Sequence, residues 1–140
     1  MSEQNKAVVR RIIEDHWNRK NPALVGELFA ATVAIHTPDG VLNAHDGARQ
    51  LLNAYATAFP DFHLSIDDLL ADGDRVTWRW TFTGTHKGPL ASIAASGKTV
   101  SVGGIGIIRV TGGKASELRL IWDKYALMQQ IGALAAQAGR

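Results

Sequence analysis

The sequence predicts an α+β fold in which helices cover one face of a curved, mainly antiparallel (mixed) sheet. Before residue 60 and again after residue 124, apolar residues recur at helical spacing. Between these segments, polar and apolar residues alternate with a period of two, and short turn motifs separate the runs, as in antiparallel hairpins. Helices packed on one face of a strongly curved sheet enclose a space, so we expect a cone with an internal pocket.

Length and composition restrict the class of protein. At 140 residues the chain has the length of one domain, and we expect 1–140 to form a single domain. Cysteine is absent, which excludes disulfides, thiolate metal sites and a cysteine nucleophile, and we expect a cytoplasmic location. The N-terminus lacks a signal-peptide pattern, and no apolar run approaches the roughly 20 residues that span a bilayer. With a net charge of +2 and no basic cluster, neither nucleic acid nor a membrane is an expected partner.

Two helices are predicted at the N-terminus. The first covers residues 3–20, with His16 and Trp17 on its apolar stripe. Asn21 and Pro22 then supply the cap and the first position of a short second helix that ends near residue 30. His16 is most simply a buried core residue, although a side chain on this stripe could also reach the pocket.

The remaining elements follow in the order β-α-β-β-β-β-α. A strand over residues 32–37 precedes a third helix, which Asp46 is expected to cap and Pro60 to stop. Four further strands and a last helix are predicted at 62–67, 76–83, 99–110, 115–123 and 125–136, with turns at Asp72-Gly73-Asp74 and Thr111-Gly-Gly-Lys114.

Aromatic residues and glycines mark the expected pocket wall. Trp78, Trp80 and Phe82 alternate along one predicted strand and therefore share a face, which we expect to be concave and covered by helices. A buried indole N–H needs an acceptor, so either tryptophan could donate to a ligand carbonyl. On the next strand, Gly104 and Gly106 share a face and leave a notch, which serves either sheet curvature or the approach of a ligand.

Asp123 is the strongest candidate for chemistry. It follows the apolar run Leu118, Leu120, Ile121 and Trp122, and a carboxylate desolvated by such neighbours can act as a general base near neutral pH. The alternative is that Asp123 only caps the last helix, because aspartate is a favoured N-cap.

The histidines do not suggest a metal centre. All five lie on different predicted elements and show none of the known metal-binding spacings, so we expect neither a metal nor a cofactor. His36 ends a predicted strand directly before Thr37-Pro38-Asp39-Gly40, a place that could lie at the mouth of the cone.

Several short segments occur in a fixed order along most of the chain. They include His36-Thr-Pro38, Phe59-Pro-Asp61, Asp72-Gly-Asp-Arg-Val76, Gly84-Thr-His-Lys-Gly88, and Asp123 followed by Leu127-Met-Gln-Gln-Ile-Gly132. In this order and spacing the chain resembles the SnoaL-like polyketide cyclases of the NTF2-like superfamily, which also includes ketosteroid isomerases.

The resemblance implies a cone with a deep apolar pocket and a homodimer or homotetramer formed through the sheet. It also implies that the aspartate matching Asp123 is the acid/base in an intramolecular aldol condensation, with neither metal nor cofactor. The sequence departs from the family in two places. Arg119 stands where many relatives carry tryptophan, and residues 103–107 lack the histidine that cyclases tend to have on the penultimate strand.

Three functions are therefore in competition. The first is a cofactor-independent cyclase or related enolising enzyme, acting on a small apolar carbonyl compound with Asp123 as acid/base. In it, His36 and His16 are candidate orienting or polarising groups. The second is an epoxide hydrolase, isomerase or dehydratase that uses Asp123 together with Arg119. The third is a non-catalytic module that binds a lipophilic small molecule. The residues expected to contact the ligand are His16, Trp17, Trp78, Trp80, Phe82, Gly104 and Gly106.

Overall fold

The computed structural model describes residues 2–134 and confirms the predicted α+β fold. A seven-stranded curved sheet has the strand order β2-β1-β7-β6-β5-β3, and β4 also pairs with β5. In chain order the elements are α1 (Ser2–Arg11), the π-helical η1 (Ile12–Trp17), the 3-10 turn η2 (Pro22–Leu24), α2 (Val25–Leu28), β1 (Phe29–Thr37), β2 (Gly40–Asn43), α3 (Ala44–Ala58), β3 (His63–Leu64), β4 (Asp68–Asp72), β5 (Arg75–Thr85), β6 (Thr99–Thr111), β7 (Lys114–Trp122) and α4 (Lys124–Gln130).

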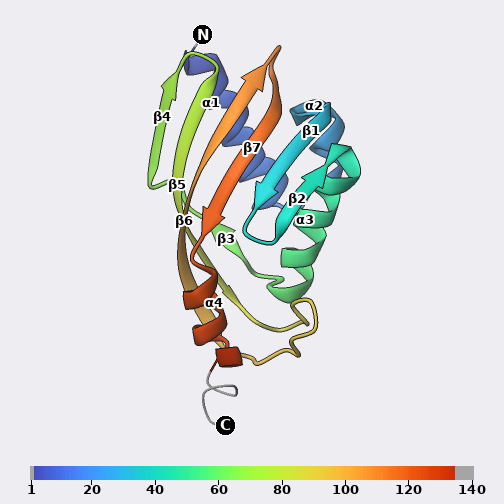
Figure 1. Cartoon of the computed structure of the whole chain (residues 1–140), viewed down its shortest axis with the longest axis vertical. Helices are drawn as coiled ribbons and strands as arrows, with labels where there is room; N and C mark the ends of the chain where they lie inside the picture. The colour runs from blue at the N-terminus through green and yellow to red at the C-terminus, as the bar shows by residue number, and fades with distance from the viewer. Residues whose placement is uncertain (1, 135–140) are drawn as a thin grey trace.

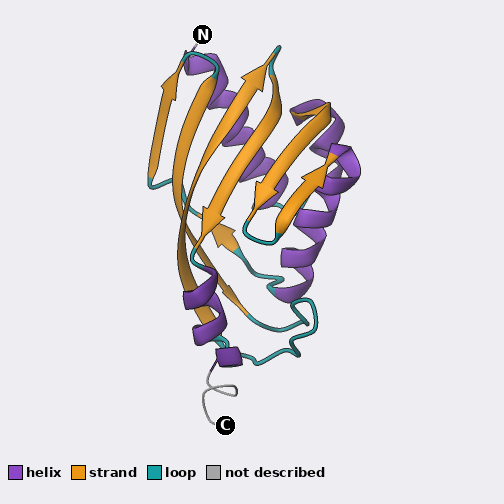
Figure 2. Cartoon of the chain, viewed as in Figure 1, coloured by secondary structure: helices purple, strands orange, loops and turns teal. Residues whose placement is uncertain are grey.

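The helices lie behind one face of the sheet (Figures 1 and 2). α1 packs against β4 and β5, whereas α3 packs against β1 and β2, so the two helices cover different halves of the inner face. The pairing of β1 with β7 is parallel, and the other strand pairs are antiparallel. α4 continues from the end of β7 at one end of the sheet (Figure 1).

The N-terminal elements occur in the predicted order but with different bounds. The short second helix ends at Leu28, and β1 begins at Phe29, three residues before the predicted strand. The predicted helix 3–20 appears as α1 followed by η1, in which Ile12, Ile13, His16 and Trp17 are buried. The Asn21 side chain accepts a hydrogen bond from the Ala23 N–H at 3.1 Å, as expected of the cap of the next helical segment.

Later elements also differ from the prediction. α3 begins at Ala44, after Asn43 at the N-cap position, so the prediction that Asp46 caps this helix is wrong. The sequence analysis also missed β2, which forms a hairpin with β1 through a turn that ends at Gly40, with φ of 124°. α4 ends at Gln130, and a turn at residues 131–132, with Gly132 at a φ of 85°, interrupts the predicted helix 125–136. Residues 133 and 134 are helical again, and residues 135 and 136 lie outside the described residues.

The predicted strand at 62–67 is also incomplete. Only His63 and Leu64 pair with β5 there, and β4 (Asp68–Asp72) pairs further along the same strand. Between the two, the Ser65 hydroxyl accepts a hydrogen bond from the Thr81 N–H at 2.9 Å. A side chain thus replaces part of the backbone ladder, and the strand is divided in two.

The inner face of the long strands forms the core. Trp78, Trp80 and Phe82 are buried there, which confirms the prediction that they share the helix-covered face. A Cβ added to Gly104 would lie 2.2 Å from the Trp80 ring, so the Trp80 indole packs directly against the backbone of β6. The absence of a side chain at Gly104 therefore makes room for Trp80.

Candidate functional site

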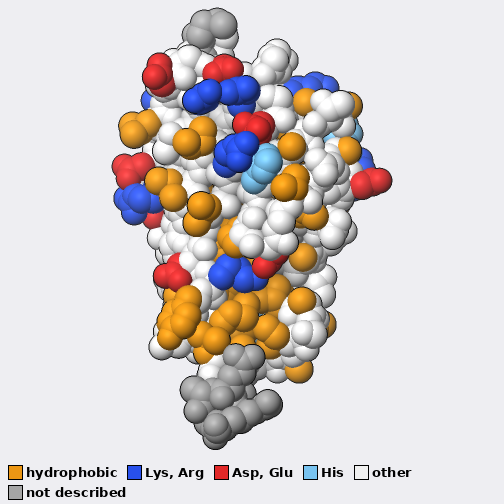
Figure 3. Space-filling model, in the orientation of Figure 1, with side chains coloured by type: hydrophobic (Ala, Val, Ile, Leu, Met, Phe, Trp, Pro, Cys, Tyr) orange, Lys and Arg blue, Asp and Glu red, His pale blue; other side chains and the backbone are white. Residues whose placement is uncertain are grey.

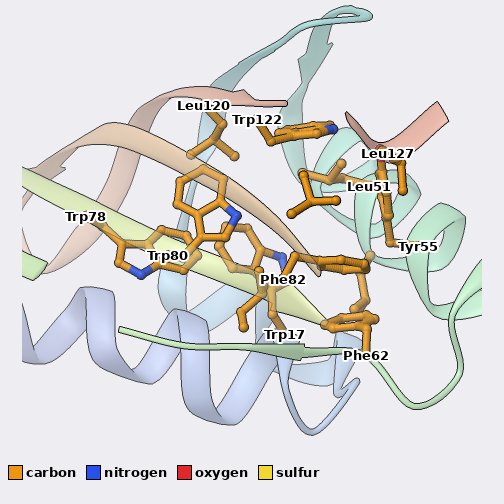
Figure 4. Close-up of a pocket in the computed structure, with 13 residues that line it drawn as sticks. Trp17, Leu51, Tyr55, Phe62, Trp78, Trp80, Phe82, Leu120, Trp122 and Leu127 are labelled. Carbon is orange, nitrogen blue, oxygen red and sulfur yellow. The ribbon is translucent and has the colours of Figure 1, made fainter. Parts of the chain in front are cut away.

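An apolar cavity lies between the inner face of the sheet and the helices (Figure 4). Its enclosed volume is about 70 Å³, and about 580 Å³ of atom-free space lies within it when the open mouth is included. A single water needs roughly 10–15 Å³ of such enclosed volume, so the inner part can hold a ring-sized apolar group. The lining residues are Trp17, Leu51, Leu52, Tyr55, Phe62, Leu64, Trp78, Trp80, Phe82, Val102, Leu120, Trp122 and Leu127.

Stacked aromatic rings make up much of the cavity wall. Trp17 of η1 stacks on Trp78 of β5 with a centroid distance of 5.5 Å, and Trp78 lies 4.3 Å from Trp80. Phe62 stacks on Phe82 at 5.5 Å. Such contacts between helical and strand residues hold the rings in fixed orientations, so the wall is preorganised for an apolar ligand.

Two contacts hold the ends of the cavity together. The Gln130 amide of α4 both donates to the Ser101 carbonyl at 3.0 Å and accepts from the Ser101 N–H at 2.7 Å. Lys124, at the start of α4, donates to both carboxylate oxygens of Asp39 at 2.9 Å. These bonds tie α4 to β6 and to the β1–β2 turn, and Leu127 of α4 is thereby held against the cavity.

Polar groups are few in this wall, and several of them, including the indole N–H groups of Trp17 and Trp80, make no hydrogen bond within residues 2–134. The Trp78 indole N–H donates to the Ser65 carbonyl at 3.1 Å, which removes it as the ligand donor that the sequence analysis considered. The Trp122 indole nitrogen is buried and has no hydrogen-bond partner within residues 2–134. The Tyr55 hydroxyl makes no hydrogen bond of normal geometry with residues 2–134, but it lies close enough to the Trp122 N–H to be affected by it.

The surroundings of Tyr55 keep its phenol neutral. Its ring meets Trp122 edge-on at 5.6 Å and Phe82 edge-on at 5.7 Å. Burial raises the pKa of Tyr55 well above its ordinary value of 10.0, the negative charge of Asp39 adds to this, and the nearby Trp122 N–H opposes it. Tyr55 therefore presents an O–H donor at neutral pH.

Asp123 does not line the cavity. It is exposed at the N-cap position of α4, where its carboxylate accepts a hydrogen bond from the Ala126 N–H at 2.9 Å. The expected desolvation by the preceding apolar residues is not found, because successive residues of β7 point to opposite faces. Asp123 is nevertheless adjacent in sequence to Trp122, which does line the cavity.

Arg119 and His36 lie together on the outer face of the sheet. Arg119 is 3.4 Å from a carboxylate oxygen of Glu117, and His36 is 3.7 Å from the same oxygen. Strand register places His36 opposite Arg119. Neither residue lines the cavity, and no ion pair joins Arg119 to Asp123 within residues 2–134. The structure therefore separates this pair from the pocket by the thickness of the sheet.

Three other residues that were expected to contact the ligand pack against the protein core instead. His16 is fully buried outside the cavity lining, and its Nδ1 donates to the Asn21 carbonyl at 2.8 Å. The notch beside Gly104 is filled by Trp80, and a Cβ on Gly106 would lie 2.6 Å from the Leu120 side chain. Both glycines thus accommodate core side chains and leave no open notch for a ligand.

Of the predicted ligand contacts, the structure brings Trp17, Trp78, Trp80 and Phe82 to the cavity. Sequence reasoning missed Tyr55 and Trp122. A signal for both was present, because Trp122 continues the inward alternation of Leu118 and Leu120, and Tyr55 lies one helical turn after Leu51 and Leu52.

Residues 2–134 contain no group of three or more His, Cys, Asp or Glu side chains placed to hold a metal ion. Among the described helices, none has the length and apolar character needed to cross a membrane.

Comparison with known proteins places the geometry in a family context. Residues 7–131 match the family model described as SnoaL-like polyketide cyclase, whereas no curated protein matches the sequence. A protein of Jannaschia sp. CCS1 assigned as a SnoaL-like polyketide cyclase has a TM-score of 0.88 at 21% identity, with 94% of each chain covered.

Two structures from Streptomyces are also similar. TsrD of Streptomyces laurentii has a TM-score of 0.80 at 29% identity, covering 91% of this chain and 96% of its own. AclR of Streptomyces galilaeus, assigned as a hydroxylase, has a TM-score of 0.83 at 23% identity, covering 95% and 98%. The fold is thus shared with proteins to which different reactions are assigned.

Proposed function

Since the chain belongs to the SnoaL-like polyketide cyclase family, we propose that it is a cofactor-independent acid/base enzyme that enolises, and in its own substrate cyclises, a small apolar carbonyl compound bound in the cavity. The observation that supports this most is the cavity itself. Its aromatic wall suits an apolar body, and Tyr55, the only titratable side chain among the described lining residues, is neutral at physiological pH.

The chemistry of such a reaction sets what the residues must do. A base removes a proton from the carbon beside a carbonyl, hydrogen-bond donors stabilise the resulting enolate, and the enolate carbon attacks a second carbonyl. The protonated base then returns its proton to the new alkoxide, so no external oxidant or metal takes part in the proton balance.

Asp123 remains our candidate for the base. The lining residues include no carboxylate, and Asp123 lies between two of them, one residue after Trp122 and four before Leu127. To act, its carboxylate must turn from the Ala126 N–H towards the mouth of the cavity. Only one of its two oxygens accepts the Ala126 hydrogen bond, so the movement breaks a single hydrogen bond.

The test uses 2-tetralone, an apolar ring ketone with acidic protons beside its carbonyl. We expect the protein to accelerate exchange of these protons for deuterium in D₂O, measured by proton NMR. Asp123→Asn should lower the catalysed rate by about 10²–10⁴-fold, the usual contribution of a general base, while 2-tetralone binding is kept. Asp46→Asn, another exposed carboxylate near a helix start, should leave the rate unchanged.

A non-catalytic binding module is the second candidate, and one observation favours it. The Asp123 carboxylate accepts a hydrogen bond from the Ala126 backbone N–H and so serves as the N-cap of α4. Binding of 2-tetralone without accelerated exchange, and with Asp123→Asn behaving as the wild type, would select this function over the enzyme. The hydrolase alternative has less support, because Arg119 pairs with Glu117 on the outer face.

The proposal includes a homodimer formed through the outer face of the sheet. There, Ile105, Ile107 and Ile121 are 49%, 46% and 68% exposed, and strand register places Ile105 opposite Ile121. We name these three residues the outer apolar patch. Figure 3 views this face and shows apolar side chains among scattered charges of both signs. A self-complementary two-fold contact would remove the patch from water.

A further inference from the structure

The cavity contains a buried donor that makes no hydrogen bond of normal geometry within residues 2–134, although the Tyr55 hydroxyl lies near it. Trp122 is the last residue of β7 and faces the cavity. Its indole nitrogen is buried and makes no hydrogen bond within residues 2–134. An indole nitrogen can only donate a hydrogen bond. Buried polar groups are almost always paired, and an unpaired one costs stability, so Trp122 is explained best by an acceptor that arrives with the ligand.

A second donor lies beside the first. Tyr55 comes from α3, on the opposite wall, and its ring meets the Trp122 ring at a centroid distance of 5.6 Å and an interplanar angle of 90°. Its hydroxyl makes no hydrogen bond of normal geometry with the described residues, and both side chains line the cavity (Figure 4). Because burial and Asp39 raise the pKa of Tyr55, the phenol keeps its proton.

The remaining surroundings restrict the group that these donors can bind. The other lining side chains are aliphatic or aromatic. Among their indole N–H groups, that of Trp78 is paired with Ser65, whereas those of Trp17 and Trp80 make no hydrogen bond within residues 2–134 and are not fully buried as the Trp122 N–H is. The lining residues within 2–134 include no cation, and the positive charge of Lys124 is paired with Asp39. An anionic ligand group would be desolvated without compensation. A neutral carbonyl oxygen fits, because its two lone pairs can accept from two donors.

We propose that the Tyr55 hydroxyl and the Trp122 indole N–H donate together to one neutral carbonyl oxygen of the ligand, whose apolar body fills the aromatic part of the cavity. The inference rests on the proposed use of the cavity as the ligand site, but it does not depend on Asp123 or on catalysis. If the enolisation proposed above takes place, the same two donors hold the enolate oxygen as it gains negative charge.

The test compares 2-tetralone with 2-methylenetetralin, in which a CH₂ group replaces the carbonyl oxygen at nearly the same shape. Affinities are measured by calorimetry. The wild type should bind the ketone more tightly than the alkene. Tyr55→Phe should weaken ketone binding about three- to tenfold, as expected for the loss of one neutral hydrogen bond, and leave alkene binding unchanged.

A matched control and a spectroscopic readout complete the design. The chain has two tyrosines, and Tyr125 is exposed, so Tyr125→Phe removes the same hydroxyl elsewhere and should have no effect on either affinity. In ¹⁵N–¹H spectra the Trp122 indole N–H, assigned from its loss in Trp122→Phe, should move downfield with the ketone and not with the alkene. The Trp78 indole N–H, bonded to Ser65, should move little with either.

The outcomes separate this inference from the proposed function. If the wild type binds both compounds equally well, or if the ketone leaves the Trp122 resonance unmoved, the donor pair is wrong while the cavity remains a ligand site. If neither compound binds, the cavity is not the ligand site and both proposals are wrong. If Tyr55→Phe weakens ketone binding alone, and Asp123→Asn keeps ketone binding but loses the accelerated exchange, both stand.

Discussion

At the scale of single residues, Asp123 has one role that the structure shows and one that we propose. Because Asp123 caps α4, its replacement should change the stability of the protein. Asp123→Ala removes the acceptor for the Ala126 N–H and should lower the free energy of unfolding by about 1 kcal/mol, whereas Asp123→Asn should be nearly neutral. Denaturant unfolding of the three proteins measures this.

Asp46 provides the control for that prediction. It lies in the first turn of α3 but supplies no cap, and its carboxylate pairs with the Arg49 guanidinium at 3.4 Å on the exposed surface. Asp46→Ala should therefore cost less than Asp123→Ala. Equal losses would mean that the hydrogen bond to Ala126 contributes nothing beyond helix-end electrostatics.

Two buried histidines predict how stability depends on pH. Burial lowers the pKa of His16 and of His86 below their ordinary value of 6.5. As the pH falls through 6.5, the unfolded chain takes up protons that the folded protein does not, so the free energy of unfolding should decrease. Each histidine can contribute at most about 1.4 kcal/mol per pH unit.

His16→Asn isolates one of these contributions. The asparagine amide can still donate to the Asn21 carbonyl but does not titrate in this range. Between pH 7.5 and pH 5.5 the variant should lose less stability than the wild type, as followed by urea unfolding at each pH. An identical loss in both proteins would show that His16 is not a source of the pH dependence.

At the scale of elements, the contact between β5 and β6 depends on Gly104. Gly104→Ala would place a Cβ against the buried Trp80 ring and should cost about 1–3 kcal/mol, the usual range for overpacking a core. At Gly103 the nearest atom to a new Cβ is 4.0 Å away, so Gly103→Ala should change stability little. Chemical denaturation distinguishes the two, and similar stabilities would contradict the packing described here.

Most elements could be predicted from the sequence, because long alternating runs such as 76–83 have a single consistent face. The missed elements have physical reasons. β2 has only four residues, in which polar and apolar side chains do not alternate. β4 is defined by its pairing with β5, which the sequence does not reveal. The start of α3 was misplaced because Asp46 has the chemistry of a cap, whereas Asn43 occupies that position without a side-chain bond.

The site was harder to predict than the fold. The aromatic wall could be predicted because polar and apolar residues alternate along β5. Trp78, Trp80 and Phe82 were therefore correctly assigned to the buried face of the sheet. The side on which Asp123 lies depends on how the chain leaves β7, which no spacing reveals. The position of Tyr55 against Trp122 depends on how α3 packs on the sheet, and that is a property of the tertiary structure.

At the scale of the whole molecule, the outer apolar patch predicts self-association. Ile107→Lys places a charge in the middle of the exposed face and should shift the protein from dimer to monomer in analytical ultracentrifugation at micromolar concentration. Ala54→Lys adds the same charge on the exposed surface of α3 and should leave the dimer intact. A wild type of about 15 kDa under these conditions would contradict a dimer.

The central claim is that the ligand site is the cavity between the sheet and the helices. Intermolecular nuclear Overhauser effects between 2-tetralone and the assigned protein protons test it most directly. We predict contacts from the ligand ring to Trp80, Phe82 and Leu120, which line the inner face. Contacts confined to Ile105, Ile107 and Ile121 would place the ligand on the outer face instead and contradict the account.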